Sequence, residues 1–158
     1  MTEESKQKKG YRGYISSRPA NGIFVPQRIQ NLVIRNYAQA RGLIFLLSAT
    51  EYYMENCFMM LEAVMKEELS SLEGIILFSL DLMPADRMKR EYFYTDILQN
   101  EASLHFALEG LKLSNAEECS AIEDIFIARV LSEQPRSLKH SEKDVFTSYN
   151  ERILDRYA

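Results

Sequence analysis

Polar side chains follow each of the short apolar runs of this sequence, and their types could bind a ligand or move a proton. In chain order they are Ser16, Ser17 and Arg18, then Ser48, Glu51 and Tyr52, then Ser79 and Asp81, and finally Glu109. If the runs are parallel strands, their carboxyl ends meet at one edge of a sheet, where open α/β folds bind ligands. The pattern predicts a polar cleft at that edge, although polar strand ends also occur simply because loops are solvated.

Three of these residues are candidates for catalysis. Glu51 and Asp81 suit acid or base work, provided that burial or proximity raises the pKa of one of them. Ser16 is a candidate nucleophile only if Asp81 lies within its reach. Isolated carboxylates are weak evidence, so the sequence leaves open whether the protein is an enzyme.

The segment between Arg12 and the helix pattern that starts at Pro26 resembles an anion-binding loop. It carries hydroxyls and an arginine, and a helix start offers unpaired N–H groups and a partial positive charge. Ser17 and Arg18 are the predicted anchor, although Arg18 fits an exposed loop position equally well. The predicted ligand-binding set is Arg12, Ser17, Arg18, Gln27, Gln30, Asn31, Ser48, Tyr52, Ser79 and Glu109.

The sequence predicts no metal site and no cofactor. Its histidines, His105 and His140, are far apart, and Cys57 and Cys119 stand in no zinc-ligand spacing. His105 has apolar neighbours, which is more typical of a hydrogen-bonded core histidine than of a ligand. The chain has no GxGxxG, P-loop or GxSxG motif, so nucleotide binding by these motifs is not supported.

Strand and helix patterns alternate along the chain. Short apolar or β-prone runs predict strands at residues 11–16, 43–47, 74–80 and 103–108. Amphipathic patterns predict helices at 26–41, 57–69 and 85–100 and from 114 toward Pro135, with residues 48–56 as a loop. Such alternation predicts an α/β fold, a three-layer sandwich with a mainly parallel four-stranded sheet.

Length and composition indicate one soluble domain. The chain has 158 residues, of which 46% are hydrophobic and 27% charged. We expect a disordered leader at 1–10, a single domain at 11–133 and a tail at 134–158.

The tail either forms an amphipathic helix that docks on a partner chain or is frayed, and we expect a homo-oligomer. No apolar run reaches ~18 residues and no secretory signal is present, which predicts no membrane span and a cytoplasmic location.

The charge balance argues against nucleic acid as a partner. The formal net charge is −4, whereas phosphate neutralisation needs clustered lysines and arginines. Basic residues do cluster at Lys6, Lys8, Lys9 and Arg12, which is more typical of a solvated tail than of a polyanion site.

The stretch Arg12-Gly13-Tyr14-Ile15-Ser16 and the order of the elements resemble the catalytic domain of the serine recombinases (resolvases and invertases). That family carries Tyr-x-Arg-Val-Ser on its first strand and Leu-Asp-Arg-x-x-Arg after its third. Here Ser16 and Asp81 match, whereas Tyr14, Leu82 and Ala85 stand where the family has arginine. The resemblance implies a resolvase-like or flavodoxin-like fold over residues 11 to about 110.

Longer runs resemble a bacterial family called sporadic carbohydrate cluster proteins. They are residues 12–19, 25–35, 45–52, 60–62 and 104–109, which read RGYISSRP, VPQRIQNLVIR, FLLSATEY, MLE and LHFALE. This resemblance implies a role in surface-polysaccharide or lipopolysaccharide biosynthesis and gives no reaction.

The sequence therefore leaves three hypotheses. The first is a protein of glycan biosynthesis that binds a sugar phosphate or nucleotide sugar at the strand ends. The second is a non-catalytic assembly subunit of a glycan-pathway enzyme, and the third is a degenerate recombinase-like domain that acts on DNA.

Overall fold

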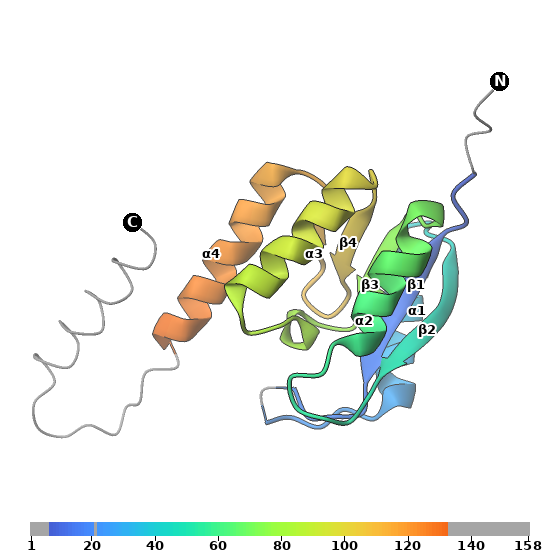
Figure 1. The fold of residues 1–158 in the computed structure, drawn as a ribbon. Helices are drawn as coiled ribbons and strands as arrows, with labels where there is room; N and C mark the ends of the chain where they lie inside the picture. Colours follow the sequence, from blue (N-terminus) through green and yellow to red (C-terminus); the bar gives the residue numbers. More distant parts are fainter. Residues whose placement is uncertain (1–6, 21, 133–158) are drawn as a thin grey trace, which may run out of the picture. The chain divides into compact units, whose positions relative to one another are not determined.

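The computed structural model describes residues 7–20 and 22–132. They form a five-stranded sheet in the order β2-β1-β3-β4-β5 (Figure 1). The strands are β1 Tyr11–Ser16, β2 Phe45–Glu51, β3 Gly74–Leu77, β4 Ser103–Phe106 and β5 Leu111–Leu113. The first four are parallel, and β5 runs antiparallel to β4. The predicted α/β class is confirmed, and the sheet has one strand more than the predicted four.

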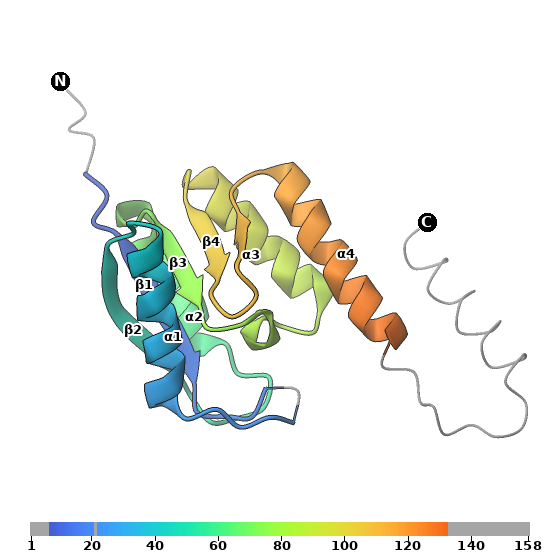
Figure 2. The same cartoon turned by 180° about the vertical axis from the view of Figure 1, so that it is seen from behind.

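Helices lie on both faces of the sheet. They are α1 Gln27–Ala40, α2 Met59–Ala63, α3 Arg87–Gln99 and α4 Ala116–Ser132. Helix α2 continues as a π-helical turn at Val64–Glu68 and a 3-10 turn at Leu69–Ser71. A further 3-10 turn spans Leu80–Leu82. α2 and α3 cover one face, and α1 covers the other (Figures 1 and 2). This is the predicted three-layer arrangement.

Strand β3 forms the centre of the core. All of its residues are buried, as expected for the continuously apolar run GIIL between two parallel neighbours. Gly74 is required there, because a Cβ atom at this position would collide with the Ser103 carbonyl oxygen. Gly13 on β1 has the same role, since a side chain would collide with the Ser48 hydroxyl.

Two differences from the predicted elements have physical reasons. Strand β2 begins at Phe45 and extends to Glu51, although residues 48–51 look like the start of a polar loop. Its polar side chains find partners on neighbouring elements, so the strand continues. Strand β5 has only three residues, too few to show a period in the sequence.

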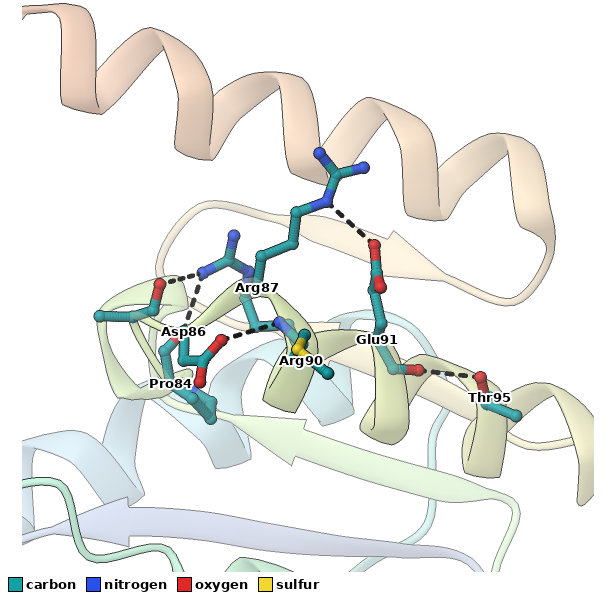
Figure 3. A network of polar contacts seen from close by, with 8 residues as sticks. Pro84, Asp86, Arg87, Arg90, Glu91 and Thr95 are labelled. Atoms are coloured by element: carbon teal, nitrogen blue, oxygen red, sulfur yellow. Dashed lines mark hydrogen bonds and ion pairs between the residues drawn. The ribbon is translucent and has the colours of Figure 1, made fainter. Parts of the chain in front are cut away.

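The start of helix α3 is fixed by a local polar network (Figure 3). The Asp86 carboxylate caps the helix by accepting a 2.9 Å hydrogen bond from the Met88 N–H. Arg90, only 4% exposed, donates hydrogen bonds of 3.0 and 2.7 Å to the carbonyls of Pro84 and Ala85. The arginine thereby fastens the loop that leads into its own helix.

Contacts divide the chain into one unit that ends at Ile122 and a second that begins at Glu123. The predicted tail at 134–158 lies outside the described residues, as do residues 1–6 of the predicted leader. In the described part of that leader, the Lys9 N–H donates to the Ser71 carbonyl at 2.9 Å. No helix among residues 7–20 and 22–132 is long and apolar enough to cross a membrane.

Candidate functional site

The strand order reverses between β1 and β3, and open α/β sheets bind ligands at the carboxyl side of such a point. Ser16 ends β1 there, and Ser79 and Asp81 follow β3. The register supports this juxtaposition, because Tyr14 pairs with Leu77 two residues before Ser16 and Ser79. The predicted polar edge therefore starts at Ser16, Ser79 and Asp81.

Ser16 is held rigidly at this edge. Its backbone N–H donates to Gln30 Oε1 at 3.1 Å, and Gln30 Nε2 donates to the Ser16 carbonyl at 2.7 Å. The Ser16 hydroxyl oxygen accepts the Arg18 N–H at 3.2 Å, and the residue is fully buried. Gln30 reads as a surface amide in the sequence, but it is a buried clamp between α1 and β1.

A tyrosine–carboxylate pair lies beside Ser16, on the face that α2 covers. The Tyr14 hydroxyl donates a 2.7 Å hydrogen bond to Glu51 Oε2, and both side chains are buried. Glu51 also accepts the backbone N–H groups of Tyr52, Met60 and Leu61 at 3.0 to 3.2 Å. The carboxylate therefore caps the start of α2, where the helix dipole favours negative charge.

This environment holds Glu51 in its ionised form. Burial would raise the pKa of Glu51, but the hydrogen bonds from Tyr14 and from three backbone N–H groups outweigh it, and the net pKa is lowered. Burial, together with the adjacent Glu51 carboxylate, raises the pKa of Tyr14. Glu51 is thus a fixed anion at neutral pH rather than a carboxyl whose pKa is raised for acid catalysis.

Arg18 fastens the loop between β2 and α2. Its Nη1 atom donates to the carbonyls of Met54 and Cys57 at 2.9 and 2.7 Å. Its guanidinium lies 4.7 Å from the centre of the Phe58 ring. These contacts give the arginine a structural role at this position, and its predicted role as an anion anchor stays a prediction.

Ser79 and Glu109 form a second pair at the same edge. The Ser79 hydroxyl donates to Glu109 Oε1 at 2.6 Å and accepts the Asp81 N–H at 3.1 Å. Glu109 also accepts the Leu80 N–H at 3.1 Å. The pair closes the turn after β3 and leaves the Asp81 side chain half-buried.

The remaining predicted residues are dispersed. Arg12 lies toward the other end of β1, where it donates to the Leu47 carbonyl at 2.7 Å and pairs with Glu68 at 3.2 Å. Asn31 accepts a 2.6 Å hydrogen bond from Ser48. Gln27 and Tyr52 are exposed, and Ser17 is half-buried. In the described residues no group of His, Cys, Asp and Glu is arranged to hold a metal ion.

Sequence reasoning missed Tyr14 as the centre of the site. The signal was available, because alternation along a strand places Tyr14 and Ser16 on one face. It also missed Cys57, whose thiol lies 3.5 Å from Glu51 Oε1.

No family model matches the chain, and no curated protein matches it. Solved structures similar to this chain include an integrase domain and a resolvase family recombinase. The N-terminal catalytic domain of TP901-1 integrase aligns with 80% of this chain and 99% of that domain, with a TM-score of 0.54 and 17% identity. A resolvase family site-specific recombinase from Streptococcus pneumoniae aligns with 92% of this chain and 97% of that chain, with a TM-score of 0.53 and 10% identity. The similarity shows a resolvase-like fold.

These neighbours overturn the leading hypothesis. Both are recombinases, and neither is a protein of carbohydrate biosynthesis. The predicted sugar-binding function in polysaccharide biosynthesis is therefore wrong on this comparison. The predicted sugar-phosphate or nucleotide-sugar partner is wrong on the same ground, and so is the expectation that nucleic acid is not a partner.

Proposed function

We propose that this protein is a recombinase-fold domain that binds DNA and does not cleave it. The observation that carries the DNA-binding half is the similarity to the catalytic domains of an integrase and a resolvase family recombinase over most of the chain. This part of the proposal is an analogy from the fold, and one fold hosts many functions. The proposal that the protein does not cleave DNA is argued from the residues at the strand edge.

The strand edge is poor in the positive charge that phosphoryl transfer needs, because Arg18, two residues after Ser16, is engaged by the Met54 and Cys57 carbonyls and the Phe58 ring. Catalysts of this step stabilise the developing charge on the phosphate with arginine, lysine or a metal ion. The resemblance to serine recombinases places family arginines at Tyr14, Leu82 and Ala85, none of which is cationic. The ionised Glu51 adds a negative charge in their place. The Ser16 hydroxyl is buried as well, so this centre supports a structural role better than nucleophilic attack.

Helix α1 is the surface that best suits a DNA backbone. Its sequence, QRIQNLVIRNYAQA, contains two arginines and no acidic residue, although the whole chain has a net charge of −4. Arg28 and Arg35 are both exposed. They lie about two helical turns apart and therefore on the same side of the helix. Exposed amides such as Gln27 and Gln39 add hydrogen-bond donors, and phosphate contacts of this kind supply sequence-independent affinity.

The experiment is a binding assay with matched charge variants. A fluorescent duplex of roughly 30 base pairs is titrated with the full chain, with Arg28→Gln/Arg35→Gln, and with Lys66→Gln/Lys89→Gln. The control pair removes the same charge from exposed positions on the opposite face of the sheet (Figures 1 and 2). We expect the α1 variant to bind at least tenfold more weakly and the control to bind as the unmodified chain does. Equal losses in both variants contradict the assignment of α1.

Two finer assignments are also proposals. We propose membership of the sporadic carbohydrate cluster family as a statement about ancestry alone, supported by the runs at 12–19 and 25–35. A solved member that superposes on this chain with a TM-score no higher than 0.54 would count against it. We also propose a cytoplasmic location, because the buried Cys57 carries a free thiol.

A further inference from the structure

A pocket of about 370 Å³ shares no residue with the strand edge described above. It is lined by Tyr11, Tyr37, Arg41, Leu43, Ser103, His105, Gly110 and Lys112. These residues come from the end of α1, the segment before β2, the strands β1, β4 and β5, and the β4–β5 turn. We refer to it as the Tyr37–His105 pocket. Its volume falls in the lower part of the range that small-molecule sites occupy.

The floor of the pocket is a buried polar network. His105 is 4% exposed, and its Nδ1 atom lies 2.7 Å from the Tyr37 hydroxyl. Its Nε2 atom lies 2.9 Å from the Ser103 hydroxyl. Burial and the nearby cations Lys112 and Arg41 lower the pKa of His105 to about 4, so the ring is neutral at pH 7. A neutral imidazole between two hydroxyls offers a fixed polar surface with no charge of its own.

The walls and the rim differ in character. Tyr11 and Tyr37 pack edge-on against His105, with ring centres 5.2 and 5.5 Å apart, and give the pocket aromatic walls. Arg41 and Lys112 are exposed cations at its rim, and no carboxylate is among the lining residues. The Arg41 guanidinium lies 3.7 Å from the centre of the Tyr37 ring, which holds the cation at the pocket. Two cations beside aromatic side chains suit a ligand that carries both an anionic group and an aromatic ring.

Gly110 occupies the β4–β5 turn next to Arg41. It has a φ of +67°, and a Cβ atom there would lie 3.7 Å from Arg41 Nη2. The positive φ favours glycine here, and the turn places Gly110 beside the guanidinium at the rim of the pocket.

We propose that the Tyr37–His105 pocket binds a small phosphate monoester that carries an aromatic ring, with Arg41 and Lys112 pairing with the phosphate and the tyrosines contacting the ring. A nucleoside monophosphate has this chemistry. Arginine suits a phosphate because its planar fork of donors matches two phosphate oxygens. The proposal does not rest on DNA binding, since the pocket shares no residue with the exposed arginines Arg28 and Arg35.

The probes are adenosine monophosphate and inorganic phosphate, titrated into the full chain by calorimetry. Imidazole NMR in a His140→Gln background reports on His105 alone. We expect adenosine monophosphate to bind at least tenfold more tightly than phosphate and to shift the His105 ring signals, and we expect Arg41→Gln and Lys112→Gln each to weaken binding about tenfold. Lys66→Gln, the charge control on the other face, should bind normally. Absence of binding at about 10 mM, equal affinity for both probes, or unchanged His105 signals overturns the proposal.

Discussion

The Tyr14 hydroxyl donates a 2.7 Å hydrogen bond to the Glu51 carboxylate across two neighbouring strands, at the sheet edge where Ser16 ends β1. The pair places a neutral phenol and an anion beside Ser16. Three backbone N–H groups complete the carboxylate's hydrogen bonds. This edge is consequently a stabilising centre of the fold, and DNA binding is expected at a different surface.

Tyr14→Phe tests the strength of this pair. We expect a loss of about 1 to 3 kcal/mol in the free energy of unfolding, because a buried carboxylate loses a donor. The pKa of folded Glu51 should rise toward its ordinary value. Glu51 stabilises the fold above its unfolded pKa, and this stability is lost as the pH falls through the lower folded pKa. In the variant this loss should therefore be smaller and should be complete at a higher pH. Urea unfolding between pH 7 and pH 3 measures both effects, with the exposed Tyr92→Phe as control.

Gln30→Ala tests the clamp on Ser16. The variant removes the Gln30 hydrogen bonds to the buried N–H and carbonyl of Ser16 and to the Val25 carbonyl, so we expect a loss of about 2 to 4 kcal/mol. Gln39→Ala, at an exposed position of the same helix, should change stability by less than about 0.5 kcal/mol. Chemical denaturation compares the two, and equal effects would show that Gln30 is not a clamp.

His105 makes stability depend on pH in a defined window. Its folded pKa of about 4 is depressed from 6.5, so the unfolded chain takes up the proton first as the pH falls. The histidine's contribution is complete above pH 6.5 and is lost between pH 6.5 and about 4, by roughly 2 to 3 kcal/mol. His105→Gln should lack this part of the acid loss, and Lys112→Gln should show a smaller loss because one of the cations that lower the pKa is gone. An unchanged acid loss in both variants would mean that His105 already titrates normally.

Arg90 gives a matched test of a buried cation against an exposed one. Arg90→Met removes two hydrogen bonds to the Pro84 and Ala85 carbonyls and should destabilise the fold by about 2 to 4 kcal/mol. Arg87→Met, three residues earlier, removes an exposed ion pair with Glu91 and should cost less than about 1 kcal/mol. Thermal unfolding ranks the two; a reversed order would contradict the network in Figure 3.

The elements with strong periodicity were predictable from the sequence. Strand β1 and helix α1 follow from a β-prone run and from Pro26 at the start of an amphipathic pattern. The hydrogen-bond partners of the buried polar side chains were not predictable from the sequence. Glu51 looks like a loop residue in the sequence, yet its carboxylate caps α2 by accepting the N–H groups of Met60 and Leu61. Gln30 looks like a surface amide, yet it binds the Ser16 backbone. These contacts join residues from different elements, and periodicity carries no information about them.

The function was harder to predict, because net charge is a property of the whole chain and binding depends on one face. The value of −4 argues against nucleic acid, yet α1 carries arginines and no carboxylate. Long matching runs pointed to carbohydrate biosynthesis, whereas the solved structures of similar fold are recombinases.

The most direct test of DNA binding is a salt titration of the unmodified full chain on a duplex of roughly 30 base pairs, followed by fluorescence anisotropy. We predict saturable binding at about 50 mM salt and an affinity that falls linearly with salt on logarithmic axes, with a slope of about −2 or steeper if Arg28 and Arg35 each neutralise one phosphate. Absence of binding at that salt concentration, or an affinity that does not change with salt, would contradict the account.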